Sequence, residues 1–309
     1  MAFTSGNAPR LLQAGLQTIF GDVYPTYKGQ WEQLFKTFVS DKQFEDDLQV
    51  VSMGLPTQLS EGNTVTYDTF KQGWGKRYTH AEYAKGFAIT RVMLEDVQNA
   101  VSLTAKASNQ MMNSMAQLKE IIGANIFNNA FSTAAANLGG DGKALLRTDH
   151  PLGGSGGTFQ NTLTSASDLT EASLEQARID ISHIVDDAGL RIQLRPGRLV
   201  VPVELITEAV RITQNPLRAG TADRDINALY EMGIFKDMPL VNNYLTDTDA
   251  WFILVEGLSE DEGLKHLKRR AVDVEMDNDF NTGNLLMKVT ERYCFGWTNP
   301  RALYGSPGA

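Results

Sequence analysis

The sequence has little cysteine and no long uninterrupted run of apolar residues. Because Cys294 is the only cysteine, an internal disulfide is impossible, and cysteine-ligated zinc and iron–sulfur clusters are excluded. No stretch supplies the roughly eighteen consecutive apolar residues of a membrane-spanning helix, and residues 1–10 do not resemble a secretion signal. We therefore expect a protein made in a reducing cytoplasm, with no membrane partner.

The chain also lacks an excess of positive charge. It has 28 lysines and arginines against 37 acidic residues, which gives a net charge of -9. Tight nonspecific binding to nucleic acid depends on lysines and arginines that release condensed counterions, so a dedicated DNA-binding role is disfavoured. With 42% hydrophobic residues, the chain should bury a sizeable core, and its 309 residues suggest two packed units.

No recognisable catalytic or phosphate-binding motif is present. The four histidines are His80, His150, His183 and His266. Asp149 and His150 are the most suggestive pair, but adjacent loop residues point apart, and a turn role is favoured. The glycine-rich residues 153–157 lack the Gly-Lys-Ser or Gly-Lys-Thr ending of a phosphate-binding loop. A soluble hydrolase that uses His150 and Asp149 is the minor alternative.

One polar segment resembles a calcium-binding loop in part. Asp277, Asp279 and Asn281 alternate as oxygen ligands do in such loops. The glycine falls one place late, however, and Lys288 stands where a bidentate glutamate belongs. A polar hairpin turn is the favoured interpretation, and the sequence predicts neither a metal nor another cofactor.

The apolar pattern predicts an α+β protein. Residues 91–136 contain no proline and repeat apolar side chains at helical spacing, which predicts a helix of about thirty residues that Gly123 bends or ends. Three methionines on this stripe are predicted core residues: Met111, Met112 and Met115. A second helix is expected from Thr170 to a C-terminal cap at Gly189.

Short strands are predicted around these helices. After a turn at 195–197, a strand at 199–201 leads into a helix that starts with proline, and residues 240–241 and 251–255 read as buried strands. The last predicted element is a hairpin, in which residues 271–276 pair with residues 285–290 across a polar turn.

The first ninety residues are predicted to project from this core. An arm carries two short helical stripes, at 12–19 and 31–38, which are too short to be stable unless they pack on this subunit or on a neighbour. A hairpin-like region follows, with strands at 64–67 and 83–89 and Trp74 near its tip. An exposed two-stranded hairpin is marginal in water, so it needs a partner surface, unless it folds back on its own core.

Four short stretches, in this order along the chain, resemble the major capsid proteins of tailed phages, most closely the Mu-like major head subunit group: Glu61-Gly62, Phe87-Ala88-Ile89-Thr90-Arg91, Thr148-Asp149-His150-Pro151 and Leu199-Val200-Val201-Pro202. The resemblance implies the Hong Kong-type capsid fold, an α+β architecture. It assigns an N-terminal arm to 1–50, an extended hairpin loop to 51–90, and a peripheral domain with a long spine helix to 91–169. The axial domain is 170–265, and residues 266–309 return to the peripheral domain.

The resemblance implies a non-enzymatic subunit that self-assembles through hexamers and pentamers into an icosahedral virion shell. Such a shell encloses double-stranded DNA without sequence-specific binding and forms in the cytoplasm of a bacterial host. Scaffolding, portal and decoration proteins are the expected partners. An encapsulin-type bacterial nanocompartment, which has the same fold but encloses a cargo enzyme, is the alternative.

Seven residues are candidate intersubunit contacts. Two aromatic residues belong to the predicted arm, and Trp74 is the proposed anchor of the extended loop. The basic candidates include part of the basic triplet at 268–270, which is more plausible as an ion-pair patch between subunits than as a nucleic-acid site. The full set is Trp31, Phe35, Trp74, Lys76, Arg77, Arg269 and Arg270.

Overall fold

The computed structural model describes residues 29–62, 64–65, 67–69, 71–96, 100–154, 156–217, 225–235 and 237–309. The stripe expected at 12–19 lies outside these residues. No helix in the described part of the chain is long and apolar enough to cross a membrane.

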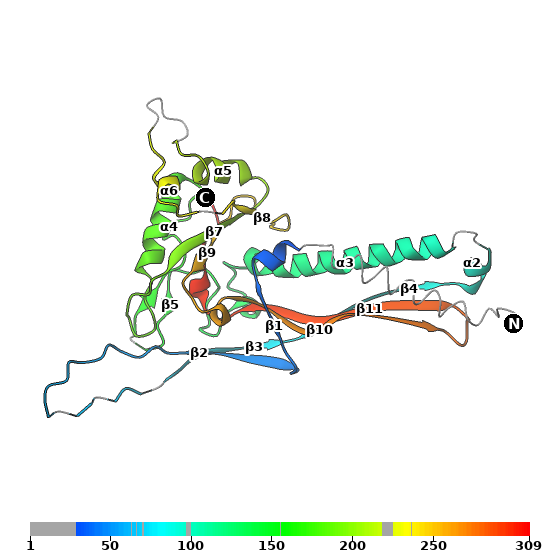
Figure 1. Ribbon diagram of the computed structural model, residues 1–309, viewed down its shortest axis with the longest axis horizontal. Helices are drawn as coiled ribbons and strands as arrows, with labels where there is room; N and C mark the ends of the chain where they lie inside the picture. The colour runs from blue at the N-terminus through cyan, green and yellow to red at the C-terminus, as the bar shows by residue number, and fades with distance from the viewer. Residues whose placement is uncertain are drawn as a thin grey trace.

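The larger unit is a four-stranded sheet with a long helix along one face (Figure 1). We call it the helix–sheet unit. Its strands, in spatial order, are β1 (Lys36–Val39), β10 (Leu264–Asn278), β11 (Leu285–Trp297) and β4 (Ala81–Ile89). The helix is α3 (Ala100–Asn128), and the shorter α2 (Arg91–Asp96) precedes it.

The predicted long helix and its methionine core are confirmed. α3 has 29 residues, so it spans about 44 Å at 1.5 Å per residue. Met111, Met112 and Met115 are buried and form one cluster with Met287 and Val289 of β11. Gly123 does not end the helix, which continues to Asn128.

The second unit, which we call the mixed unit, surrounds a smaller four-stranded sheet. Its strands, in spatial order, are β12 (Leu303–Ser306), β9 (Trp251–Glu256), β7 (Arg195–Val201) and β8 (Leu240–Val241). Its helices are α4 (Glu171–His183), α5 (Ile206–Thr213) and α6 (Ala228–Glu231). Thr170 begins α4 with a capping box, in which its side chain accepts from the Ser173 backbone at 3.1 Å.

The sheet of the mixed unit is buried on both faces. Leu199 and Ile253 belong to the core under α4, whereas their neighbours Val200 and Phe252 pack into a second core that includes Phe127 of α3. Successive strand residues point to opposite faces, so this sheet joins the two units through one continuous interior. The buried strands predicted at 240–241 and 251–255 are confirmed.

A two-stranded hairpin projects from the other side of the molecule (Figure 1). Its strands are β2 (Phe44–Val50) and β3 (Gln72–Thr79), and residues 51–71 form the long connection between them. We call residues 44–79 the extended-loop hairpin. Two smaller strands, β5 (His150–Pro151) and β6 (Thr158–Phe159), pair within the segment that follows α3.

The predicted pairing of this hairpin was wrong. No strand forms at the described residues 64, 65 and 67, and the segment around Tyr83 is β4, which pairs with β11. β3 pairs instead with β2, from the segment predicted as an arm, and Trp74 lies within β3 rather than at a tip. β4 gains a covered face by joining the large sheet, which a free hairpin cannot give it.

Three other local predictions were corrected. Residues 31–38 form a 3-10 turn (Gln30–Gln33) followed by β1, because pairing with β10 outweighs the weak helical stripe. α4 ends at His183, and Gly189, at φ 85°, closes a tight turn six residues later. Residues 195–197 belong to β7, which carries a register shift there.

Candidate functional site: a projecting loop anchored at its base

The connection at 51–71 exposes apolar side chains. Leu55 is 73% exposed and Tyr67 is 91% exposed, and Met53, Leu59 and Val65 are exposed as well. Gly54 donates a backbone hydrogen bond to Asp68 across the loop at 2.9 Å. Several large apolar side chains on one projecting segment are typical of an interaction surface.

The base of the hairpin, by contrast, is fixed to β11 by buried contacts. The Tyr78 hydroxyl donates to the Trp297 carbonyl oxygen and accepts from the Trp297 backbone nitrogen at 3.0 Å. Burial raises the pKa of Tyr78, so this phenol stays protonated and keeps its donor. Asp47 of β2 pairs with Lys265 of β10 at 2.6 Å and accepts from Thr298.

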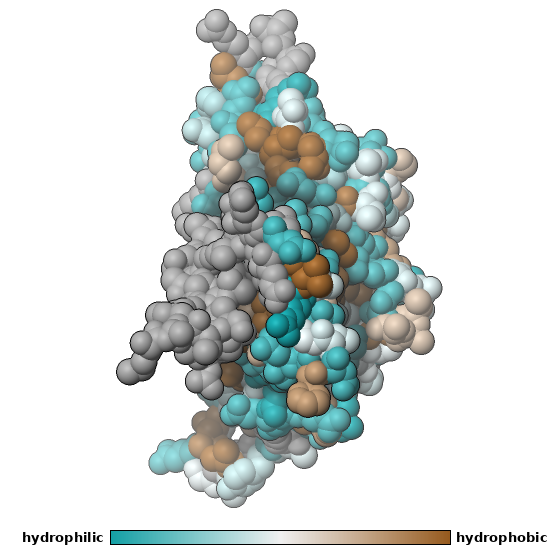
Figure 2. Space-filling model, turned by 90° about the vertical axis from the view of Figure 1, so that its right-hand side faces the viewer, coloured by the Kyte–Doolittle hydropathy of each residue, from teal (hydrophilic) through white to brown (hydrophobic). Residues whose placement is uncertain are grey.

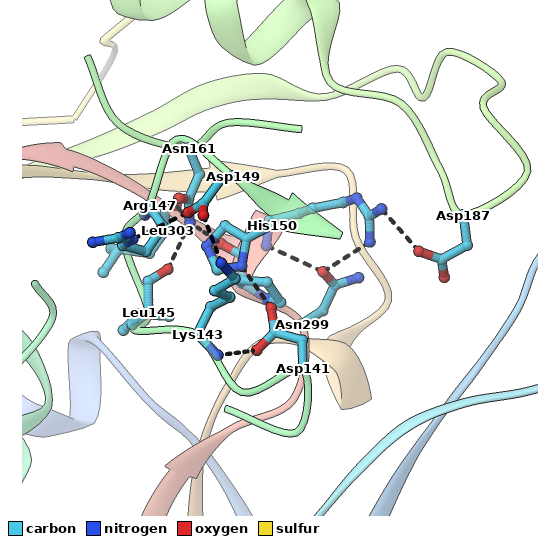
Figure 3. A network of polar contacts seen from close by, with 12 residues as sticks. Asp141, Lys143, Leu145, Arg147, Asp149, His150, Asn161, Asp187, Asn299 and Leu303 are labelled. Atoms are coloured by element: carbon cyan, nitrogen blue, oxygen red, sulfur yellow. Dashed lines mark hydrogen bonds and ion pairs between the residues drawn. The ribbon is translucent and has the colours of Figure 1, made fainter. Parts of the chain in front are cut away.

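A second set of contacts ties the hairpin to the mixed unit. Gln49 donates to Asp187 at 2.8 Å, and the same carboxylate accepts from Arg301 at 3.0 Å. Arg301 also donates to the Val185 carbonyl at 2.9 Å and stacks over the Phe159 ring at 4.1 Å. Figure 3 shows Asp187 with the dashed line of the hydrogen bond that its carboxylate accepts. We call Gln49, Asp187 and Arg301 the latch.

Three of the seven candidate contacts lie on β3. Trp74 is 39% exposed and lines a small cavity beside the latch. Lys76 is half-buried, donates to the Leu138 carbonyl at 2.6 Å, and has its pKa lowered by burial. Arg77 pairs with Asp46 at 2.6 Å and is exposed.

The other four lie on the helix–sheet unit. Phe35 is buried, 4.8 Å from Phe295 between ring centroids, and Trp31 is half-buried against His266 at 4.4 Å. Both aromatic residues therefore pack on the body of their own subunit. Arg270 pairs with Glu82 at 2.5 Å, and Arg269 is half-exposed.

The pair proposed for a hydrolase does not form. His150 is fully buried, and its Nδ1 lies 2.7 Å from Asp141 rather than from Asp149 (Figure 3). Asp149 pairs with Lys143 at 2.5 Å and with Arg147 at 3.1 Å, and these hydrogen bonds lower its pKa. The segment after α3 is thus folded by an internal polar network and presents no acid–base pair to solvent.

The turn with partial calcium-loop spacing uses its own oxygen atoms. Asp279 accepts from the Asn281 backbone at 3.1 Å and from the Thr282 hydroxyl at 2.6 Å, and the latter bond does most to lower its pKa. No group of three potential metal ligands occurs among the described residues.

A second apolar surface lies on the mixed unit around α5 and α6. In Figure 2, an apolar patch stands among polar side chains at the height at which Figure 1 places these helices. The exposed large apolar side chains described between β7 and β8 are Val203, Leu217, Ile226, Tyr230, Met232 and Met238. The chain thus presents two separate apolar surfaces, on different units.

The sequence indicated Trp74 as a candidate contact, which stays a prediction, but it did not indicate the latch or Tyr78. The Gln49 and Asp187 positions are separated by 138 residues, and those of Tyr78 and Trp297 by 219. No local pattern marks such partners, because each is polar or amphipathic and becomes buried only through the tertiary fold.

The comparisons with known proteins agree with this architecture. A family model described as phage capsid protein matches residues 75–306. No curated protein matches the chain. A virus-like particle from Pyrococcus furiosus is similar in structure at 12% identity, with a TM-score of 0.52 over 95% of this chain and 98% of that one.

Two viral-type particles are similar to the same degree. The procapsid protein of bacteriophage JBD30 has 14% identity and a TM-score of 0.54, over 98% of this chain and 76% of that one. The capsid protein of the native GTA particle has 14% identity and a TM-score of 0.53, over 92% of both chains. The fold is therefore the Hong Kong-type capsid fold, and the chain belongs to the phage capsid protein family.

Proposed function

We propose that this protein is the major capsid subunit of a tailed phage of the Mu-like group. It self-assembles through hexamers and pentamers into an icosahedral shell, in the bacterial cytoplasm, and the shell encloses double-stranded DNA. The observation that carries this proposal is the loop at 51–71, with its exposed apolar side chains, on a firmly anchored base. Family membership supports the same conclusion.

The energetic argument concerns what the loop gains on assembly. Fully burying one large apolar side chain contributes about 1.5–3 kcal/mol. Leu55, Leu59 and Tyr67 are exposed in the single chain, so a second copy of the chain is the surface on which they become buried. Because the base is fixed by Tyr78 and the latch, little conformational entropy is lost there when the loop docks.

The roles of the candidate contact residues are assigned by exposure. Trp74 and Arg77 are both exposed residues of β3, so a neighbour can reach them. Arg270 pairs with Glu82 within the chain, and Arg269 and Arg270 of β10 are the proposed ion-pair patch toward a neighbouring subunit. Trp31 and Phe35 support assembly indirectly, by fixing the start of β1 on α3 and β11.

Negative-stain electron microscopy with light scattering tests assembly directly, on the chain alone and coexpressed with neighbouring genes for scaffolding, portal and decoration proteins. We expect shells, tubes or capsomers. Leu55→Glu with Leu59→Glu should abolish them and leave a folded monomer, whereas the matched exposed substitution Thr57→Glu should assemble. A wild-type protein that is monomeric in every one of these conditions contradicts the proposal.

The contents of the particle separate a virion from a nanocompartment. We expect nuclease-protected DNA in particles assembled with the packaging proteins. An acidic chain does not bind DNA tightly on its surface, so DNA that resists nuclease is enclosed by the shell. A stoichiometric copurifying enzyme in place of DNA would instead support the encapsulin-type alternative. We also propose that the subunit has no catalytic activity, since His150 is enclosed and Asp149 is held by two cations.

A further inference from the structure

The extended-loop hairpin leaves the body through two short connections that are bonded to each other. Residues 40–43 connect β1 to β2, and His80 alone connects β3 to β4. Ser40 and His80 are both buried, and 3.1 Å separates the Ser40 Oγ atom from the His80 Nε2 atom. The hairpin therefore leaves the body at a double hinge whose two halves are joined by one side-chain hydrogen bond.

The direction of this hydrogen bond follows from its neighbours. The Ser40 hydroxyl donates to Glu45 Oε1 at 2.6 Å, so its single proton is already used. The hydrogen between Ser40 and His80 must then come from the ring Nε2. His80 Nδ1 is left as an acceptor, 3.6 Å from the Cys294 Sγ atom on β11. A series of side-chain contacts thus runs from the hairpin across the hinge to the large sheet, through Glu45, Ser40, His80 and Cys294.

The surroundings disfavour a second proton on this ring. Burial lowers the pKa of His80, and Arg292 and Arg269 lower it further, while Glu45 and the Leu267 backbone oppose them. Lys42, the remaining charged group beside these contacts, is occupied by Glu45 at 3.3 Å. The Cys294 thiol, whose pKa burial raises to about 12, stays protonated and is a poor acceptor. A cationic His80 would thus be buried and repelled by the charges of Arg292 and Arg269.

We propose that Ser40, Glu45 and His80 form a proton-sensitive bolt that fixes the direction of the extended-loop hairpin, and that uptake of a second proton by His80 opens the hinge. Opening moves the ring into water and away from Arg269 and Arg292. Acid therefore shifts the population toward a hinge that is open locally at residues 40 and 80, while the Tyr78 and Gln49 contacts still hold the base of the hairpin. The proposal rests on the proposed function only in assigning the hairpin to subunit contacts, since the hinge is a property of the single chain.

Amide hydrogen exchange on the free wild-type subunit tests the bolt. The Ser40 amide donates to the Lys268 carbonyl at 2.9 Å, a bond that must break when the hinge opens. The protection factor of the Ser40 amide is compared between about pH 7.5 and about pH 5, a range in which an unperturbed histidine titrates. The Leu174 amide of α4, bonded to Thr170 at 3.1 Å, is the internal reference for global unfolding.

Three variants make the test specific. His80→Gln keeps an amide donor for Ser40 but cannot titrate, and Ser40→Ala removes the acceptor. His183→Gln replaces an exposed histidine at the end of α4 and is the matched control.

We expect the wild type and His183→Gln to lose protection at residue 40 in acid, because the open hinge binds the second proton of His80 more readily than the closed one. His80→Gln should stay protected, and Ser40→Ala should be unprotected at both pH values. An equal loss in wild type and His80→Gln, or a parallel loss at Leu174, overturns the bolt. Assembly seen by electron microscopy is a separate readout, so shells without a pH response refute the bolt and leave the capsid function intact.

Discussion

Lys119 of α3 and Glu291 of β11 form an ion pair inside the helix–sheet unit, with side chains only 6% and 2% exposed. The Lys119 ammonium also lies 5.4 Å from the ring centroid of Trp31 and 5.0 Å from that of Tyr293. The adjacent Glu120 accepts from the Trp31 backbone at 3.1 Å. These contacts therefore join three parts of the molecule at one cluster of charged side chains: the segment before β1, the long helix and the large sheet.

Removing one partner of this pair should be more harmful than removing both. Lys119→Met removes the ammonium from the buried Glu291 carboxylate, and breaking a buried pair in this way costs about 3–5 kcal/mol. Lys119→Met with Glu291→Leu should recover a large part of that loss, because no unpaired charge remains. Urea unfolding of the two variants and wild type measures the difference, and a double variant no more stable than Lys119→Met would contradict this account.

The latch should show a similar asymmetry. Asp187→Ala removes the carboxylate that pairs with the buried Arg301 guanidinium, so we expect a loss of about 3–5 kcal/mol in the free energy of unfolding. Gln49→Ala removes a neutral donor and should cost only about 1–2 kcal/mol, and it should loosen the hairpin. Thermal unfolding ranks the two variants, while proteolysis at 51–71 reports hairpin mobility; equal losses would show that the carboxylate does not organise the latch.

The close approach of Tyr78 to β11 depends on a glycine. A Cβ atom built at Gly296 would lie 2.4 Å from the Tyr78 ring, so Gly296→Ala must displace that ring and its bond to Trp297. We expect a cost of about 1–3 kcal/mol, as for other overpacked sites. Gly54→Ala is the matched control, because its nearest neighbour is Asp68 at 3.6 Å. Similar melting temperatures for the two variants would show that the hairpin base tolerates repositioning.

Acid should weaken the core through His266. Burial, with smaller contributions from Lys119 and Lys268, lowers the pKa of His266 from 6.5 to about 3. The unfolded chain thus binds a proton more readily, and stability that is fully present above pH 6.5 is lost as pH falls toward about 3, at up to about 1.4 kcal/mol per pH unit.

His266→Phe isolates this contribution, because the ring sits among Trp31, Tyr293 and Phe295. The variant loses the contact between Thr37 and Nδ1, at 3.2 Å, but no longer titrates. Urea unfolding between pH 7 and about pH 4 should therefore fall less steeply for the variant than for wild type. Parallel slopes would assign the acid sensitivity to other groups.

Local patterns predicted the elements that can be identified within one segment. The apolar stripe of α3, with Met111 and Met115, marks a long helix regardless of its partner. The terminal hairpin of β10 and β11 was also predicted, because its two strands are neighbours in sequence and a polar turn separates them. Both strands extend further than their alternating core segments suggested, because residues 264–270 of β10 pair with residues 292–297 of β11 in the large sheet.

What the sequence by itself determined, then, is the long helix, the buried strands and the absence of a cysteine cluster, because periodicity, apolar runs and residue counts are local properties. Only the tertiary structure decided that β3 pairs with β2, that Gln49 meets Asp187, and that His80 lies against Ser40. These contacts join segments with no shared pattern, and a polar side chain selects its partner by geometry after the chain has folded.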